Sequence, residues 1–258
     1  MNTNHTNILR TRVIIQITGL RPDVLKETNQ KRWPEGKLAE VELRFIDGAF
    51  VTHRLTGLAV REGKKGKYVQ MPSRSYMKDR TRKYYDYLHT GNWLTRRAFR
   101  HAILKEHKRT IKAHKDGQAP TPEEHELLLQ VIITALPSRK TEWPESKRAE
   151  AEVRFLSGFM RNHTLRNVTI WASKDGDGFD VTGPARSYSK DGNKRFFDYL
   201  SSRDEGGRDN VNVIFTREYR DEIQRQLTFA GDDDEEFDTV DDDDPETLGE
   251  SIDDDTPF

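Results

Sequence analysis

Basic and aromatic residues lie close together in two segments of the sequence, a combination suited to holding an unpaired nucleic-acid strand. A positively charged surface can follow the phosphate backbone while bases stack on aromatic rings, each stack contributing roughly 1–3 kcal/mol. The first segment contains Arg74, Tyr76, Lys78, Arg82 and Lys83 together with Tyr84, Tyr85 and Tyr87. The second contains Arg186, Tyr188, Lys190, Lys194 and Arg195 together with Phe196, Phe197 and Tyr199. Both segments are therefore candidate binding sites.

Some of these rings are expected to pack in the core instead. Adjacent rings, as at 84–85 and 196–197, point in different directions in any regular structure, so one of each pair should face inward. Tyr76 and Tyr188 lie beside the basic turns and are the better stacking candidates, with packing as the alternative. A helix expected at 94–108 adds arginines on its polar side. The candidate nucleic-acid-binding residues are Arg74, Tyr76, Lys78, Arg82, Lys83, Arg96, Arg97, Arg100, Arg186, Tyr188, Lys190, Lys194 and Arg195.

The two segments occupy matching positions in a unit that occurs twice. Residues 82–88 (RKYYDYL) match 194–200 (KRFFDYL), keeping two bases, three aromatic rings, one acid and one leucine in order. Residues 39–45 (AEVELRF) likewise match 149–155 (AEAEVRF), and the tripeptide WPE precedes both. Self-similarity of this extent indicates an internal duplication.

Each copy is expected to fold as strands followed by one helix. Apolar and charged residues alternate in 39–45, as in a strand with one buried face. The expected strands are 13–18, 39–45, 50–60 and 67–71 in the first copy and 127–134, 149–155, 160–172 and 178–182 in the second. In the first helix, Leu94, Ala98 and Ala102 are expected on the apolar side, joined by Phe99 and Ile103; the second carries a stripe from Phe215 to Leu227.

The predicted fold class is α+β, with two tandem copies of a small antiparallel sheet, each with a C-terminal helix, arranged as a pseudo-dimer. The first copy spans 1–115, a linker with Gly117, Pro120 and Pro122 spans 116–126, and the second copy spans 127–230. Residues 231–258 cannot bury enough apolar surface to offset chain entropy and are expected to be a disordered acidic tail.

Charge is distributed unevenly along the chain. The formal net charge is -1, but residues 231–258 hold 15 Asp and Glu and no Lys or Arg. The rest of the chain therefore holds 43 basic residues against 29 of the 44 acidic ones, a net charge of about +14. A positive body suggests a polyanionic partner, because neutralising phosphates releases counterions. Solubility is the alternative explanation.

Gly66-Lys67-Tyr68-Val69-Gln70-Met71-Pro72-Ser73-Arg74 resembles a segment of the SpoVG family of bacterial nucleic-acid-binding proteins. In that family the comparable strand also ends in a Met-Pro-Ser-basic turn. The resemblance covers roughly 36–109 and, more faintly, 146–228. It implies a small antiparallel sheet with a C-terminal helix and a dimer as the working unit, which two fused copies would form within one chain. The leading strands and the aromatic-rich run after the turn depart from the family pattern.

The C-terminal end resembles the terminal peptide of bacterial single-stranded DNA-binding proteins, which has several Asp followed by a residue and Pro-Phe. Here Thr256 stands where that family usually has an aliphatic residue. The resemblance implies a tip whose terminal ring enters an apolar pocket of a partner while carboxylates meet basic side chains. The implied partner-binding residues are Asp253, Asp254, Asp255, Pro257 and Phe258. A featureless acidic tail is the alternative.

Other matched residues have structural explanations. Trp33 and Trp143 precede proline at the start of a strand; each is expected to cap the core, with base stacking as the alternative. His53 and His163 lie in strands with no second ligand at metal-binding spacing, so a structural role is expected.

An enzyme is not expected. The sequence has no GxxxxGK loop, no HExxH and no nucleophile elbow, so only the glutamates at 40, 42, 150 and 152 could act as paired metal-binding carboxylates. Solvated strand faces commonly carry such residues. Neither a cofactor nor a metal is expected.

The remaining expectations concern location and partners. Cys is absent, which fits a reducing compartment, and no leader or long apolar run is present, so a cytoplasmic protein without a membrane partner is expected. The sequence favours a single-stranded DNA-binding protein that recruits DNA replication, recombination or repair proteins through its C-terminal tip. The alternative is a SpoVG-like regulator that binds double-stranded DNA or RNA. Homo-oligomerisation stays open.

Overall fold

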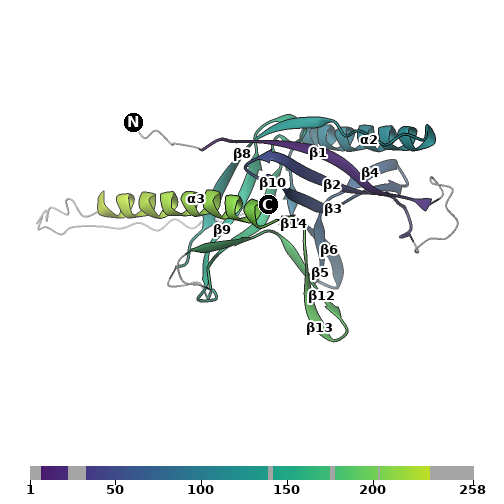
Figure 1. The fold of residues 1–258 in the computed structure, drawn as a ribbon. Coiled ribbons are helices and arrows are strands. Elements are labelled where there is room, and N and C mark those ends of the chain that lie inside the picture. The colour runs from purple at the N-terminus through teal and green to yellow at the C-terminus, as the bar shows by residue number, and fades with distance from the viewer. Residues whose placement is uncertain (1–6, 23–32, 139–141, 175–177, 203, 233–258) are drawn as a thin grey trace, which may run out of the picture. The chain divides into compact units, whose positions relative to one another are not determined.

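The computed structural model describes residues 7–22, 33–138, 142–174, 178–202 and 204–232 (Figure 1). The chain up to Glu222 forms one compact unit, and the chain from Ile223 onward forms a second. The first unit contains every strand that is described. The tail tip with its predicted partner-binding residues, Asp253 to Phe258, lies outside the described residues.

The two halves of the chain contribute the same order of elements. The first half contains β1 (Leu9–Leu20), β2 (Lys37–Gly48), β3 (His53–Gly63), β4 (Gly66–Gln70), β5 (Ser73–Lys78), β6 (Thr81–Asp86), β7 (Leu88–His89) and helix α2 (Trp93–Lys115). The second half contains β8 (Glu124–Ala135), β9 (Lys147–Phe155), a short 3-10 helix η1 (Gly158–Met160), β10 (Thr164–Ala172), β11 (Phe179–Thr182), β12 (Ala185–Lys190), β13 (Asn193–Asp198), β14 (Leu200–Ser202) and helix α3 (Glu205–Asp232).

A single ten-stranded sheet runs through both halves. Its strands follow the order β11-β10-β9-β8-β1-β2-β3-β14, with β4 also paired to β3 and β7 also paired to β10. All of these pairings are antiparallel, and the halves meet where β1 pairs with β8. Each half also gives one short strand to the other, because β7 pairs with β10 and β14 pairs with β3. The small sheets expected from the sequence are therefore joined into one curled antiparallel sheet (Figure 1).

The alternation predicted for β2 is confirmed. Ala39, Val41, Leu43 and Phe45 are at most 3% exposed, and the matching apolar side chains of β9 are buried too. Glu42 departs from the pattern: it is also buried, at a point where the pairing of β2 with β3 shifts register. The predicted strands thus form the core of the sheet, with a bulge that the sequence pattern does not show.

Each helix packs against the other half of the chain. Phe99 of α2 stacks on Phe159, which lies in η1, with ring centroids 5.8 Å apart. In α3, Phe215 meets Phe50, between β2 and β3, edge to face at 6.4 Å. These contacts, together with the exchange of β7 and β14, join the two halves in one shared core.

The apolar side predicted for the first helix is wrong in part. Leu94 is 56% exposed, and Ala98 is exposed as well. The buried side chains of α2 are Phe99, Ile103, Glu106, His107 and Thr110. The buried side is determined by contacts with the other half, which local periodicity does not reveal. No helix among the described residues has the length and apolarity needed to cross a membrane.

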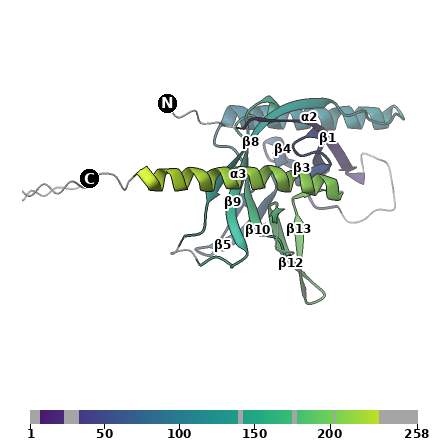
Figure 2. The same cartoon turned by 60° about the vertical axis from the view of Figure 1, so that its left-hand side comes forward.

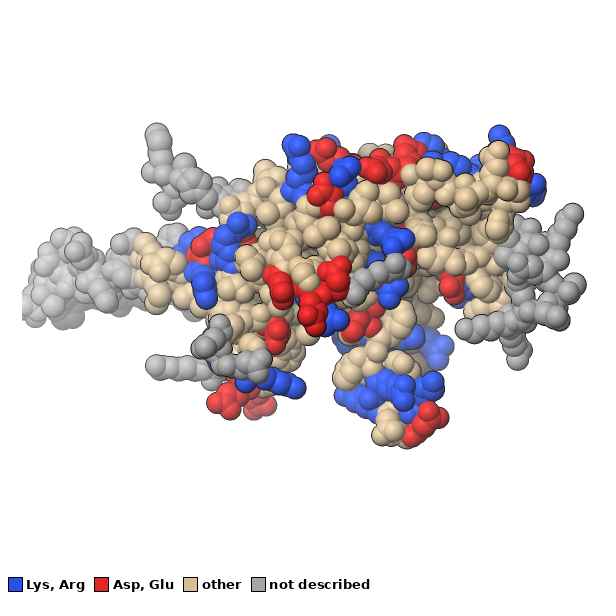
Figure 3. Space-filling model, in the orientation of Figure 1, with Lys and Arg blue, Asp and Glu red and all other residues tan. Residues whose placement is uncertain are grey.

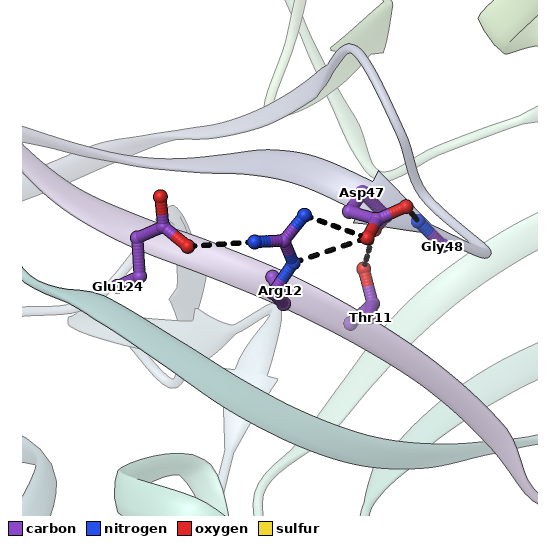
Figure 4. Close-up of polar contacts among 5 residues, drawn as sticks. All are labelled: Thr11, Arg12, Asp47, Gly48 and Glu124. Carbon is purple, nitrogen blue, oxygen red and sulfur yellow. Dashed lines mark hydrogen bonds and ion pairs between the residues drawn. The ribbon is translucent and has the colours of Figure 1, made fainter.

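An exposed charge cluster joins strands of both halves at the centre of the sheet (Figure 4). Arg12 of β1 donates two hydrogen bonds to Asp47 of β2, at 3.0 and 2.8 Å, and one to Glu124 of β8 at 2.8 Å. The hydrogen bonds from Arg12 and the backbone N–H of Gly48 lower the pKa of the Asp47 carboxyl. Because these side chains are exposed, solvent screening keeps their contribution to stability small.

Candidate nucleic-acid interface

The two basic and aromatic segments form matching β-hairpins that stand away from the main sheet. β5 pairs with β6 and β12 pairs with β13, each as a separate two-stranded sheet (Figures 1 and 2). Two-residue turns close them, Asp79-Arg80 and Asp191-Gly192, and all four residues have positive φ. This is the type I′ geometry that suits the twist of a hairpin. Arg80 is a non-glycine residue in this left-handed region, where the second hairpin has glycine.

Strand register divides the predicted residues of each hairpin between two faces. Tyr76 lies opposite Lys83, and Tyr188 lies opposite Arg195. Because side chains alternate along a strand, one face carries Arg74, Tyr76, Lys78 and Lys83 in the first hairpin and Arg186, Tyr188, Lys190 and Arg195 in the second. Arg82 and Lys194 lie on the opposite faces, beside Tyr84 and Phe196 respectively. Both faces thus combine bases with rings.

Both hairpins have exposed rings at two matching positions. Tyr84 and Phe196 are 65% and 62% exposed, while Tyr76 and Tyr188 are 43% and 40% exposed. Phe197 lies edge to face with Tyr199 at 5.2 Å, at the base of its hairpin. In the first adjacent pair Tyr84 is exposed and Tyr85 is half-buried, but Phe196 and Phe197 are both exposed, at 62% and 41%. The prediction that one ring of each pair faces inward is therefore wrong for the second hairpin.

A pair of buried tyrosines joins the bases of the two hairpins. The rings of Tyr87 and Tyr199 lie 5.0 Å apart. The Tyr87 hydroxyl donates to the carbonyl oxygen of Ala185, and the Tyr199 hydroxyl donates to that of Ser73, both at 2.9 Å. Burial raises the pKa of both hydroxyls. Each tyrosine thus holds the first residue of the other hairpin and positions the two hairpins side by side.

The basic side chains of the hairpins carry uncompensated charge. The two hairpins together hold nine Lys and Arg and four Asp, and none of the ion pairs within the described part of the chain involves them. Figure 3 shows Lys and Arg gathered on the projecting β12–β13 hairpin. Clustered, unpaired charge of one sign raises the local concentration of ions of the opposite sign.

The first half also has a groove of about 820 Å³ between its hairpin and the start of α2. The groove is lined by the predicted Arg96, Arg97 and Arg100, by Tyr84 of the hairpin, and by Trp93 and Tyr68. Trp93 is 68% exposed and Tyr68 is 43% exposed. The structure therefore brings the three helix arginines to the Tyr84 face of the first hairpin.

Three contributors to these surfaces were missed in the sequence. Trp93 and Tyr68 line the groove, and Arg80 lies at the tip of the first hairpin. The sequence held an indication for Trp93, because it lies on the helix surface within one turn of Arg96 and Arg97. Arg80 could have been found from the matched Lys-Asp pairs, which place it in the turn.

The other matched residues have structural contacts. His53 and His163 are 6% and 0% exposed, and burial lowers the pKa of both imidazoles. Trp33 and Trp143 are half-buried, with the ammonium groups of Lys37 and Lys147 over their rings, at 5.1 and 3.9 Å from the ring centroids.

The paired glutamates are engaged by basic side chains. Glu40 pairs with Lys37, and Glu42 pairs with Arg44. The matching Glu150 and Glu152 pair with Lys147 and Arg154. Among the described residues, no group of three or more His, Asp or Glu side chains gathers as a metal site would require.

Comparison with known proteins found no matching family model, no matching curated protein and no matching solved structure. The two resemblances read from the sequence are thus neither supported nor contradicted by these comparisons.

Proposed function

We propose that this protein is a cytoplasmic single-stranded DNA-binding protein whose paired hairpins, β5–β6 and β12–β13, hold the strand. The observation that carries the proposal is the pairing of unneutralised Lys and Arg with exposed rings on both hairpins. The bases contact phosphates without regard to sequence, and the rings stack unpaired bases. Recruitment of replication, recombination or repair proteins is assigned to the C-terminal tip, on its resemblance to the tips of bacterial single-stranded DNA-binding proteins.

Exposed rings favour single strands over duplex as the ligand. Tyr84 and Phe196 are each more than half exposed. A base already stacked and paired inside a duplex cannot use such a ring, whereas an unpaired base gains roughly 1–3 kcal/mol from it. Large exposed rings on a projecting hairpin also have no evident packing role, because the core of the sheet is formed without them.

One feature favours a second candidate function, recognition of duplex DNA or RNA as in a SpoVG-like regulator. Two-stranded β-ribbons can enter the major groove of B-DNA, and both hairpins are ribbons of this kind. Single-stranded DNA, duplex DNA and RNA should therefore compete for one labelled single-stranded oligonucleotide. Displacement by single-stranded DNA at the lowest concentration supports the first candidate, and displacement first by duplex or RNA supports the second.

The arrangement of the halves is proposed to be an internal pseudo-dimer. Its support is reciprocity: each half gives a short strand, a helix face and a tyrosine hydroxyl to the other. A fragment of residues 1–115 would lose all three kinds of contact. It should unfold at a much lower urea concentration than the full chain, and a cooperative, stable monomeric fragment would contradict the pseudo-dimer.

Salt dependence tests the contacts with phosphates. Binding to a single-stranded oligonucleotide should weaken steeply as salt rises, because each neutralised phosphate contributes about -0.7 to the slope of log K against log salt. Replacing Arg74 and Arg186 with Ala should weaken binding to all sequences alike. An affinity independent of salt would contradict the electrostatic contacts.

Stacking is tested separately. Replacing Tyr76 and Tyr188 with Leu should weaken binding while leaving most of the salt slope, because no charge is removed. Circular dichroism of the same variant provides the control. If the variant unfolds, both rings are structural, and the stacking role falls to the more exposed Tyr84 and Phe196.

The tail is tested with two deletions. Removing residues 231–258 eliminates 15 acidic side chains that compete with DNA for the basic body, so affinity should rise, most strongly at low salt. Removing only Pro257 and Phe258 should leave DNA affinity nearly unchanged, yet abolish capture of replication and repair proteins from a bacterial lysate. If the intact and shortened proteins capture replication and repair proteins equally, the only remaining role of the tail is to compete with DNA for the basic body.

A further inference from the structure

The two helices begin in equivalent ways but present different charges. Asn92 caps α2 by accepting from the N–H of Leu94, and Asp204 accepts from the N–H of Gly207 at the start of α3. Thr90 and Ser202 in turn accept from the N–H groups of these two caps. The buried side chains that follow also correspond: Phe99, Ile103, Glu106 and His107 in α2 match Val211, Phe215, Glu218 and Tyr219 in α3.

This correspondence allows the groove-lining positions to be compared one by one. Four exposed residues of α2 line the groove, Trp93, Arg96, Arg97 and Arg100, and the matching residues of α3 are Glu205, Arg208, Asp209 and Asn212. The first set has one exposed ring and three positive charges. The second has no ring, one positive charge and two negative charges.

The three arginines at the start of α2 reduce the stability of the helix considered by itself. A helix N-terminus carries the positive end of the helix dipole, so acidic residues stabilise it and basic ones destabilise it. The first turn of α2 has no acidic residue, whereas that of α3 has Glu205. Three arginines within two turns of this end add further positive charge. Arg61, which also lines the groove, has a buried Nε with no hydrogen-bond partner among the described residues. Phosphates at Arg96, Arg97 and Arg100 would offset the positive charge at the start of α2.

We propose that the groove between α2 and the first hairpin holds the nucleotides at one end of the bound strand, so that single-stranded DNA lies across the protein in one fixed direction. The inference rests on the proposed function and extends it. Phosphates meet Arg96, Arg97 and Arg100, and bases stack on Trp93 and Tyr84. The volume of about 820 Å³ is large enough for one or two nucleotides. Two equivalent hairpins alone would accept a strand in either direction, and the groove removes that equivalence.

Direction can be measured in the full-length protein by energy transfer. The chain has no cysteine, so Asn193→Cys at the exposed tip of the second hairpin gives a single site for a fluorophore. Oligothymidylates of about 15 nucleotides, within the length that such surfaces cover, carry a quencher at either the 5′ or the 3′ end. At saturation, a fixed direction gives strong quenching with one oligonucleotide and weak quenching with the other.

A triple variant tests the groove itself. Trp93→Glu, Arg97→Asp and Arg100→Asn introduce the side chains that α3 carries at matching positions. We expect the difference between the two ends to disappear and the affinity to fall about tenfold or more, while the hairpins still bind. Since Arg100 donates to the carbonyl oxygen of Lys67, the double variant Trp93→Glu, Arg97→Asp provides the same test with that contact intact. The matched control for the double variant, Lys108→Asp with Lys112→Asn, makes the same charge change as that variant farther along α2 and should keep the difference.

The outcomes separate the two proposals. Equal quenching by both oligonucleotides in the otherwise unaltered protein, with tight and salt-dependent binding, overturns the fixed direction and leaves the hairpin function standing. A difference between the ends that survives in the triple and double variants overturns the role of the groove. Absence of binding to either oligonucleotide overturns both proposals.

Discussion

The two hairpins of this protein have stayed alike, whereas the two helix starts beside them differ. Both hairpins carry bases and rings at the same register positions, and the rings at the matching positions 84 and 196 have similar accessibility. The first turns of α2 and α3 share their caps and buried positions but not their surface charge. Under the proposed function, both hairpins serve general strand binding, and the groove adds a property that only one half supplies.

The largest expected loss of DNA affinity comes from removing the basic residues that the two hairpins share. Replacing Arg82 and Lys83 with Ser, or Lys194 and Arg195 with Ser, should weaken binding to single-stranded DNA by similar factors, about tenfold each at 0.1 M salt. All four changes together should cost about 100-fold or more and reduce the salt slope by about 2.8. Fluorescence anisotropy titrations at several salt concentrations measure both quantities.

The control for this comparison removes two bases elsewhere. Lys112 and Lys115 lie in the last turn of α2, away from the hairpins. Replacing both with Ser should change the affinity by less than about twofold, as expected for charges beyond a screening length. A loss confined to only one hairpin's variant would contradict their equivalence.

The next prediction concerns how the two helices contribute to the pH dependence of the free energy of unfolding. His107 of α2 and Tyr219 of α3 occupy matching buried positions, 1% and 8% exposed. Burial, with a smaller contribution from the charge of Lys67, lowers the pKa of His107 from 6.5 to about 4. As pH falls from 6.5 towards 4, His107 becomes protonated in the unfolded chain but stays neutral in the folded protein. The free energy of unfolding should therefore decrease across this window, by about 2–3 kcal/mol from this residue.

His107→Phe should remove that part of the pH dependence, as measured by urea unfolding at pH 7, 5.5 and 4.5. Part of the slope should remain, because burial also lowers the pKa of His53 and His163. Tyr219→Phe is the matched control and should leave the pH profile unchanged. An unaltered profile in the His107 variant would show that the pKa of this imidazole is the same in the folded and the unfolded protein.

A smaller difference is expected between the exposed rings. Tyr84→Leu removes a ring that lines the groove, while Phe196→Leu removes the ring at the matching position of the second hairpin. Both should weaken DNA binding, Tyr84→Leu by about tenfold and Phe196→Leu by about threefold, within the range for loss of one stacked base. Anisotropy titrations at a single salt concentration are sufficient. A larger loss of affinity for Phe196→Leu than for Tyr84→Leu would contradict the proposed role of the groove in binding the strand.

Much of the fold follows from the sequence, because the core strands have simple patterns. The alternation at 39–45 and 149–155 and the apolar runs at 13–18 and 127–134 all fall within observed strands. The basic and aromatic runs are predicted from the sequence as binding segments, but their folding as hairpins was not predicted. Their tight turns, Asp79-Arg80 and Asp191-Gly192, include only one glycine to indicate positive φ.

The features that sequence reasoning missed depend on contacts between the halves. β7 and β14 are two and three residues long, and they exist only because a strand of the other half offers free backbone groups. The buried side of α2 is likewise the side that packs against Phe159 and its neighbours in the second half. Long-range contacts of this kind have no local periodicity, so no pattern within one segment could reveal them.

The smallest predicted effect tests whether the hairpin bases are as equivalent as their sequences. Tyr87→Phe removes a hydroxyl that donates to Ala185, and Tyr199→Phe removes one that donates to Ser73, each at 2.9 Å. Each change keeps the ring contact at 5.0 Å and removes the hydrogen-bond donor from one partly buried carbonyl oxygen. The free energy of unfolding should fall by about 1 kcal/mol in either variant, the usual contribution of one such bond. Urea unfolding of both single variants and of the double variant measures this, and a clearly unequal pair of losses would show that one half holds the hairpins more firmly than the other. Because the two rings touch, the double variant should depart from the sum of the single changes.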